Sequence, residues 1–150
     1  MKRAIILIGI QACGKSTFRA ERFAGMTCIS LDELRTRTRE SRLLAECIES
    51  GRDFVVDNTN PTRTDRARYI SAAKAAGYTV TGYYFRSSIG ESLERNAART
   101  GKARVPDVAV AATHAKLELP SYDEGFDELY YVHIADDGFV ADKWGSEGQT

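Results

Sequence analysis

GIQACGKST, residues 9–17, is the stretch of this sequence that decides its fold. It fits the pattern G-x-x-x-x-G-K-[ST] of a phosphate-binding loop. An apolar run, residues 4–8, leads into it, and residues 15–24 are expected to form a helix that leads out of it. Because the pattern functions between a strand and a helix, both flanks support this interpretation over that of a chance glycine-rich turn.

The residue types in this loop suit a nucleoside triphosphate and its metal ion. Glycines at positions 9 and 14 allow backbone torsions that let consecutive N–H groups turn toward an anion, and the following helix directs its positive end to the same place. We expect Lys15 to act in catalysis by reaching the β- and γ-phosphates of ATP, and Ser16 to bind Mg²⁺. The residues expected to contact the nucleotide in this loop are Gly9, Ala12, Cys13, Gly14, Lys15, Ser16 and Thr17.

Length and composition indicate one globular domain over residues 1–150, with 43% hydrophobic residues for a core. The three cysteines show no C-x-x-C spacing, so we expect reduced thiols in a cytoplasmic protein. No signal peptide is expected, and no apolar run approaches the roughly 20 residues of a membrane helix, so we expect no membrane partner. The polar tail from about residue 136 is expected to be mobile.

Charge is divided unevenly along a chain whose formal net charge is zero. Residues 1–105 hold 19 Lys and Arg against 11 Asp and Glu, a net of +8, and residues 106–150 hold 2 against 10, a net of −8. Such a split allows one face to attract a polyanion. A division of charge along the chain need not produce a division in space, so a basic face and a surface without one both remain open.

Apolar strands alternate with helical segments along the chain. This order predicts an α/β fold of the P-loop NTPase type, in which helices cover both faces of a parallel five-stranded sheet and a small lid closes over it. The expected strands are residues 3–8, 27–30, 53–57, 79–85 and 129–134, with a short extra one at 139–140.

Helical segments are expected over residues 15–24, 31–50, 62–76 and 88–100, and a further helix is expected to begin at Pro106, with capping boxes at Thr62 and Ser88. Spacing of three and four residues predicts the inward faces of the last three. The residues expected inward are Tyr69, Ala67, Ile70 and Ala73, then Ile89, Leu93 and Ala97, then Val108, Ala112 and Ala115.

Polar residues follow the expected strands, and the carboxyl ends of parallel strands form one cleft. Asp32 follows the second strand, where a carboxylate can accept the proton of an attacking hydroxyl; a helix-capping carboxylate is the alternative. Arg35, one turn further on, would hold the substrate. Asp57 ends a strand that resembles a Walker B strand and would lie beside Mg²⁺ through water, with Thr59 and Asn60 near the acceptor.

Two clusters of cations stand out. Arg95, Arg99, Lys102 and Arg104 surround a helix end, and in a small kinase such a segment closes over ATP as a lid, so Arg95 and Arg99 are expected to bind its phosphates. Residues Arg35, Arg37, Arg39 and Arg42 form a second cluster, a candidate footprint for a nucleic-acid backbone. A solvated basic surface is the alternative for both.

These motifs together resemble the kinase domain of polynucleotide 5′-hydroxyl kinases, the phage type and the kinase half of the eukaryotic end-processing kinase-phosphatases. The resemblance covers residue 1 to about residue 134. Its motifs are the loop at 9–17, the Asp-x-x-Arg pair at 32–35, the VDNTNP segment at 56–61 followed by RARY at 66–69, the RNAAR segment at 95–99, and the closing segments VP at 105–106, LP at 119–120 and EGF at 124–126. Leu31 departs from the family, which often has Arg there, and Gln11-Ala12 replaces the common Pro-Gly.

The resemblance implies an ATP- and Mg²⁺-dependent kinase of the 5′-hydroxyl of DNA or RNA. It implies that Asp32 is the general base, that Arg35 holds the substrate, and that Arg99 neutralises charge during transfer. No phosphatase signature and no ligase lysine motif is present. Similar kinases phosphorylate small molecules, so a small-molecule or nucleoside hydroxyl is the alternative acceptor, and a nucleotide-binding switch without kinase activity is a third.

Overall fold

The central strand β1, Arg3–Ile8, has every residue after Arg3 buried. It pairs in parallel with β3, Phe54–Asp57, on one side and with β4, Thr79–Phe85, on the other. A strand that is apolar on both faces has to be covered on both, and this is why the chain alternates between strands and helices. β1 ends at Ile8, directly before the phosphate-binding loop.

The computed structural model describes residues 2–86, 88–101, 104–135 and 138–145. The remaining strands are β2 (Thr27–Ile29), β5 (Glu128–Ala135) and β6 (Gly138–Lys143), and the sheet order is β2-β3-β1-β4-β5-β6. The helices are α1 (Lys15–Arg22), α2 (Leu31–Leu34), α3 (Arg37–Ser50), α4 (Arg63–Ala75), α5 (Ile89–Ala98), α6 (Asp107–Lys116) and the short 3₁₀ helix η2 (Tyr122–Glu124).

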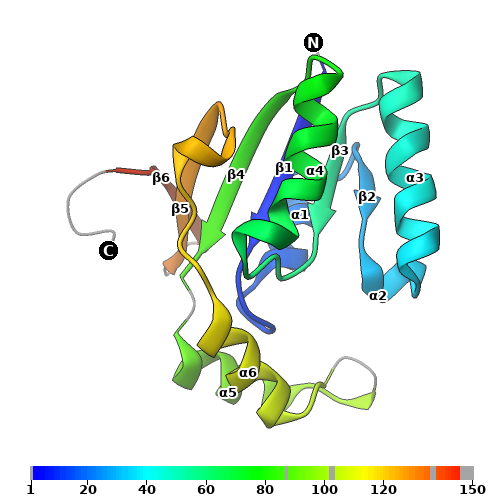
Figure 1. Ribbon diagram of the computed structural model, residues 1–150. Coiled ribbons are helices and arrows are strands. Elements are labelled where there is room, and N and C mark those ends of the chain that lie inside the picture. Colours follow the sequence, from blue (N-terminus) through cyan, green and yellow to red (C-terminus); the bar gives the residue numbers. More distant parts are fainter. Residues whose placement is uncertain (1, 87, 102–103, 136–137, 146–150) are drawn as a thin grey trace.

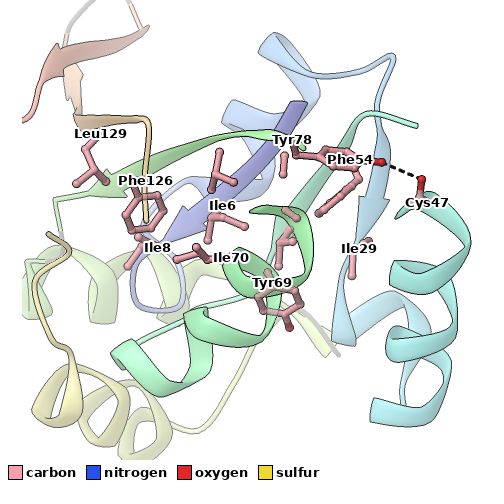
Figure 2. Packing of buried hydrophobic residues seen from close by; sticks show 14 of the residues in the cluster. Ile6, Ile8, Ile29, Cys47, Phe54, Tyr69, Ile70, Tyr78, Phe126 and Leu129 are labelled. Carbon is pink, nitrogen blue, oxygen red and sulfur yellow. Dashed lines mark hydrogen bonds between the residues drawn. The ribbon is translucent and has the colours of Figure 1, made fainter. Parts of the chain in front are cut away.

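The sheet divides the apolar core into two clusters. On one face α3 and α4 pack over Ile6, Ile8 and Phe54, and the Tyr78 hydroxyl donates a hydrogen bond of 2.9 Å to the carbonyl of Cys47 on α3 (Figure 2). On the other face Phe18 of α1 is fully buried among the second cluster. Helices α5 and α6 lie beyond the carboxyl ends of the strands (Figure 1). The five parallel strands and the covering of both faces are confirmed.

The sixth strand corrects the expectation of a short addition and a mobile tail. β6 spans six residues and pairs antiparallel with β5, from Ala135↔Gly138 to Tyr130↔Lys143. Phe139 and Ala141 are half-buried while Val140 and Asp142 are exposed, which is the alternation of an edge strand. A strand with one covered face needs few apolar residues, so the signal in the sequence is weak. Residues 136–137 and 146–150 of the expected tail lie outside the described residues.

Helix α6 faces inward differently from the expectation. Val108, Ala112 and Ala115 are exposed, and α6 instead buries Val110 and Thr113. The small residues around α6 define no strong apolar face, and the Thr113 hydroxyl accepts a hydrogen bond of 3.1 Å from Gln11 in the phosphate-binding loop.

In α5 the buried positions are polar. Ser92 and Asn96 are fully buried, whereas Ala97 is exposed. Ile89 and Leu93 are half-buried and pack against the second apolar cluster, as expected. The Asn96 amide exchanges two hydrogen bonds, of 2.6 and 2.9 Å, with the backbone of Val105, which rotates the helix toward the segment that follows it.

Helix α4 also buries a charged residue that its apolar spacing did not predict. Tyr69, Ile70 and Ala73 are buried as expected, whereas Ala67 is exposed and Arg66 is fully buried.

The Arg66 guanidinium forms two hydrogen bonds, of 2.8 and 3.1 Å, with the carboxylate of Glu124 in η2. It also donates to the backbone carbonyls of Asn60 and Glu118. Arg66 therefore joins α4 to the loop after β3 and to the segment that follows α6.

We expect Arg66→Ala to lower the free energy of unfolding by about 3 kcal/mol, because the buried carboxylate of Glu124 would lose both hydrogen bonds to its main partner and keep only Arg63, at 3.9 Å, as a charged partner. Chemical denaturation measures the change. Arg39→Ala, at an exposed position of α3, is the control and should stay within about 0.5 kcal/mol. Equal stability of the two variants would contradict this role of the buried pair.

Candidate active site

The phosphate-binding loop leaves the first amide groups of α1 available to an anion. Gly14 is the N-cap with φ of 99°, no side chain caps the helix, and its first turn contains no acidic residue. A helix start of this kind favours a negatively charged group. Of the two glycines expected to need unusual torsions, only Gly14 has a positive φ; the second left-handed residue of the loop is Ala12, with φ of 62°.

The Lys15 ammonium lies inside the loop. It is buried and donates hydrogen bonds of 2.9 Å to the carbonyl of Gly9 and 2.8 Å to that of Ile10, with the Cys13 sulfur 3.5 Å away. The Gly9 amide in turn donates to the carbonyl of Thr59, at 3.0 Å, which ties the loop to the segment after β3. The loop therefore concentrates positive charge where its amide groups converge.

Asp57 ends β3 beside α1. Its Oδ2 accepts a hydrogen bond of 2.9 Å from the Ser16 hydroxyl and one of 3.1 Å from Nε of Arg19. The carboxylate is buried, and a buried carboxylate is stable only when it is paired or coordinated. Arg19, one turn further along α1, supplies the positive charge that pairs with Asp57, and no motif in the sequence indicated this residue.

The opposite wall of the site is α2. Its N-cap is Ser30, so Asp32 lies inside the first turn and is not the capping carboxylate that was the alternative. Arg35 is the C-cap of α2 and has a φ of 74°, which is an unusual backbone conformation for a residue other than glycine. Both side chains are exposed and both line the cavity that contains the phosphate-binding loop.

This cavity has a volume of about 750 Å³. It contains nine of the residues selected from the sequence: Ala12, Gly14, Lys15, Ser16, Asp32, Arg35, Asp57, Thr59 and Arg99. Four others complete its lining, namely Gln11, Leu31, Asn58 and Val105. Asn58 lies inside the VDNTNP segment, so the motif pointed to its position without indicating its contacts.

Five selected residues are not in the lining. Gly9 and Cys13 contact Lys15 from within the loop, Thr17 is exposed on α1, and the guanidinium of Arg95 lies 3.5 Å from the carbonyl of Ala12. Asn60 is buried, and its amide donates to the carbonyl of Leu7 at 2.7 Å. The expected contact between Asn60 and an acceptor is therefore corrected to a bond that fixes the end of β1.

The lid side of the cavity is formed where α5 ends. Arg99 is the C-cap of α5, and the bonds of Asn96 to Val105 hold the following segment against the helix. Arg99 and Val105 consequently border the same cavity as Lys15. Lys102, also expected in this lid, lies outside the described residues.

The oxygen donors near the loop suit Mg²⁺. The Ser16 hydroxyl and the Asp57 carboxylate are in contact, and Mg²⁺ is usually held by one or two such groups together with water and substrate phosphates. Within the described residues no group of three His, Cys, Asp or Glu side chains is placed to hold a metal.

The Cys28 thiol, on β2, lies close enough to Asp57 for their charges to interact, and it is a weak nucleophile at neutral pH. Burial raises the pKa of Cys28 to about 12, and the charges of Glu33 and Asp57 add to the shift while Arg19 opposes it. The Cys28 thiol is therefore protonated at neutral pH, and the reactive thiolate is scarce. All three cysteines are free, as expected.

No helix of the described chain is both long and apolar enough to span a membrane.

A family model described as AAA domain matches residues 5–120, which include the phosphate-binding loop, Asp57 and Arg99. The chain belongs to this family, AAA_33. A curated relative of this AAA domain, from Schizosaccharomyces pombe, is named bifunctional polynucleotide phosphatase/kinase. It is 24% identical over 133 residues, which are 85% of this chain and 33% of the relative. The AAA domain thus spans about a third of that protein's length.

Solved structures share the fold of the AAA domain at low sequence identity. The complex of AvrRxo1-ORF1 and AvrRxo1-ORF2 with ATP has a TM-score of 0.70 at 17% identity, covering 94% of this chain and 57% of the other. A gluconokinase from Sinorhizobium meliloti 1021 has a TM-score of 0.60 at 21% identity, covering 90% and 84%. The fold is therefore that of P-loop kinases.

We expect Ala12→Gly to raise the free energy of unfolding of the AAA domain by about 0.5–1 kcal/mol, because the left-handed backbone costs an alanine more than the glycine gains in unfolded-state entropy. The matched control, Ala20→Gly on the exposed side of α1, should lower it by about 1 kcal/mol. Thermal unfolding followed by circular dichroism measures both. Destabilisation by both substitutions would contradict strain at Ala12.

Proposed function

We propose that this protein is an ATP-dependent kinase that transfers the γ-phosphate of ATP to the 5′-hydroxyl of DNA or RNA. The observation that carries the proposal is the shared cavity, in which a carboxylate and a guanidinium of α2, Asp32 and Arg35, face the Lys15 side of the phosphate-binding loop. Phosphoryl transfer needs positioned phosphates, a base for the attacking hydroxyl and cations for the developing charge, and this cavity contains a candidate for each.

The nucleotide side of the proposal rests on the start of α1. Its uncapped amide groups would bind the phosphates, and Lys15 would exchange the carbonyls of Gly9 and Ile10 for phosphate oxygens. Ser16 and Asp57 would hold Mg²⁺, and the ion would withdraw negative charge from the phosphates of the bound nucleotide. Arg99 would approach the transferred group from the lid.

The acceptor side rests on α2. Arg35 would hold the acceptor strand so that its terminal hydroxyl lies near Asp32 and the γ-phosphate. The hydroxyl oxygen forms the new bond to phosphorus while the bond between phosphorus and the β-phosphate oxygen breaks and ADP leaves. The hydroxyl proton passes to the carboxylate of Asp32. Every atom of the transfer is then accounted for with ATP and the hydroxyl as the two substrates.

A nucleic-acid acceptor is supported by charge as well as by the name of the relative from S. pombe. Exposed arginines continue from Arg35 along α3 at Arg39 and Arg42. Such a row suits contacts with successive phosphates, which would make binding weaken steeply with added salt. Arg37 is also partly exposed, but it is paired with Glu40 at 2.8 Å and contributes less free charge.

The deciding experiment gives the protein ATP labelled on the γ-phosphate, Mg²⁺ and oligonucleotides with a 5′-hydroxyl, as DNA and as RNA. Label on the 5′ end supports the proposal, and the ratio of the two products identifies the preferred strand. If ATP binds but neither strand is labelled, the proposal is wrong, and transfer of label to a small hydroxyl compound would then indicate a small-molecule kinase. Slow ATP hydrolysis that no acceptor stimulates would indicate a switch instead.

We expect Asp32→Asn to lower kcat by about 10²-fold or more, because the amide cannot accept the hydroxyl proton. Affinity for ATP, measured by calorimetry, should stay unchanged since the phosphate-binding loop is intact. Glu33→Gln is the matched control on the same helix and should keep the rate. A near-normal kcat for Asp32→Asn would exclude Asp32 as the base.

We expect Arg99→Ala to lower kcat by about 10²-fold or more, because a cation directed at the transferred group stabilises the transition state more than the ground state. Circular dichroism should show an unchanged fold. Arg52→Ala, at an exposed position away from the cavity, should behave as the unaltered protein does. If both variants have the same rate, the lid has no catalytic role.

A further inference from the structure

Helix α2, which bears Asp32, is too short to be stable by itself. It has four residues, and isolated helices below about 12 residues are marginal in water. The Ser30 side chain, at the N-cap, makes no capping hydrogen bond. Instead the Leu31 amide donates a hydrogen bond of 2.9 Å to Oδ1 of Asn58, from the segment after β3. The start of α2 is therefore held from a neighbouring element.

The orientation of the Asn58 amide is fixed in turn by Glu40 of α3. Nδ2 of Asn58 donates 2.8 Å to Oε2 of Glu40 and 3.1 Å to the hydroxyl of Tyr69. An amide whose nitrogen is held by two acceptors has to present its oxygen on the other side, where the Leu31 amide lies. Glu40 thus decides which end of the Asn58 side chain faces α2.

Glu40 is held rigidly enough for this task. The Glu40 residue is only 1% exposed, although α3 also has a solvent-exposed side. Arg37 donates 2.8 Å to its Oε1, and Arg68 of α4 lies 3.5 Å from the same oxygen. Burial and the nearby Glu40 charge raise the pKa of Tyr69 to about 12, so the Tyr69 hydroxyl remains neutral at physiological pH.

We propose that Glu40 is a positioning residue that acts through Asn58 to hold the start of α2, and thereby orients the carboxylate of Asp32 toward the acceptor. This inference rests on the proposed kinase function, in which Asp32 is the base. The chain of contacts has two links, Glu40 to Asn58 and Asn58 to Leu31, and the second anchor of α2 is Leu34, which packs against the core. A weaker contact joins Glu33 to Arg19 of α1 at 3.9 Å, so loss of the Asn58 bond loosens the start of the four-residue helix while its other contacts remain.

Reversal of the first hydrogen bond gives a specific test. In Asn58→Asp the new carboxylate would face the carboxylate of Glu40. In Glu40→Gln the new amide would face the amide of Asn58 and would no longer fix its orientation. In the double variant Glu40→Gln with Asn58→Asp, the new glutamine nitrogen donates to the new carboxylate, the other carboxylate oxygen accepts from Leu31, and the glutamine oxygen still accepts from Arg37. The contact is restored with donor and acceptor exchanged.

We expect each single variant to lower kcat by about 10- to 100-fold, the usual cost of a misplaced reacting group, with KM for ATP unchanged within about twofold. The double variant should recover most of the lost kcat. Glu46→Gln, an exposed position of the same helix, is the control and should match the unaltered protein. A normal kcat in both single variants, or a double variant that regains stability without regaining rate, would overturn the proposal.

A second measurement does not depend on activity. Hydrogen exchange of the Leu31 amide, followed by NMR, should be slow in the unaltered protein, faster in each single variant and slow again in the double variant. Equal exchange in all four proteins would overturn the link through Asn58. If the unaltered protein transfers no phosphate to either oligonucleotide, the proposed function fails, and this exchange still decides whether Glu40 holds the start of α2.

Discussion

The parallel pairing of β1 with β3 and β4 is the constraint on which the site depends. Parallel strands end at the same edge, so the loop after β1 and Asp57 at the end of β3 meet there without any further device. The pairing also leaves β1 buried on both faces, and the helices that cover it must begin at that edge. The N-terminus of α1 and the short α2 are consequences of this arrangement (Figure 1).

Behind the cavity, buried charges hold the polar loops in place. The carboxylates of Asp57, Glu40 and Glu124 are each almost fully buried, and each has an arginine partner within 3.1 Å. Such pairs add little net stability compared with apolar packing, but removal of one partner is costly. Their geometry is directional, which suits them to fix the orientation of side chains and loop ends at a reacting site. The apolar core alone has no such directional property.

The sequence predicted most of the strands and the location of the cleft. Buried parallel strands are continuous apolar runs, and the phosphate-binding loop has a pattern that few other structures produce. The inward face of α6 was wrong, because α6 buries Val110 and Thr113 instead. The inward face of α5 was right for Ile89 and Leu93, but apolar spacing gave no sign of its fully buried polar residues, such as Asn96. The second left-handed residue of the loop, Ala12, was also unexpected since alanine gives no signal for that torsion.

Contacts between distant segments were the part that could not be predicted. Glu40 and Asn58 are 18 residues apart, and Arg66 and Glu124 are 58 apart. A charged residue at a buried position looks in sequence like any surface residue, so only the fold reveals its partner. For the same reason Asn60 was assigned to the acceptor when its amide in fact fixes the end of β1.

The edge strand β6 makes the phosphate-binding loop dependent on a distant part of the chain. A Cβ added at Gly14 would come within 3.1 Å of the ring of Phe139, which also packs edge-to-face against Phe18 and Phe85. The ring therefore forms part of the floor beneath the loop. A truncated or fused version of this domain therefore has to keep the chain through Trp144, whose amide is bonded to Leu129, because a cut before Gly138 would strip the loop of its support.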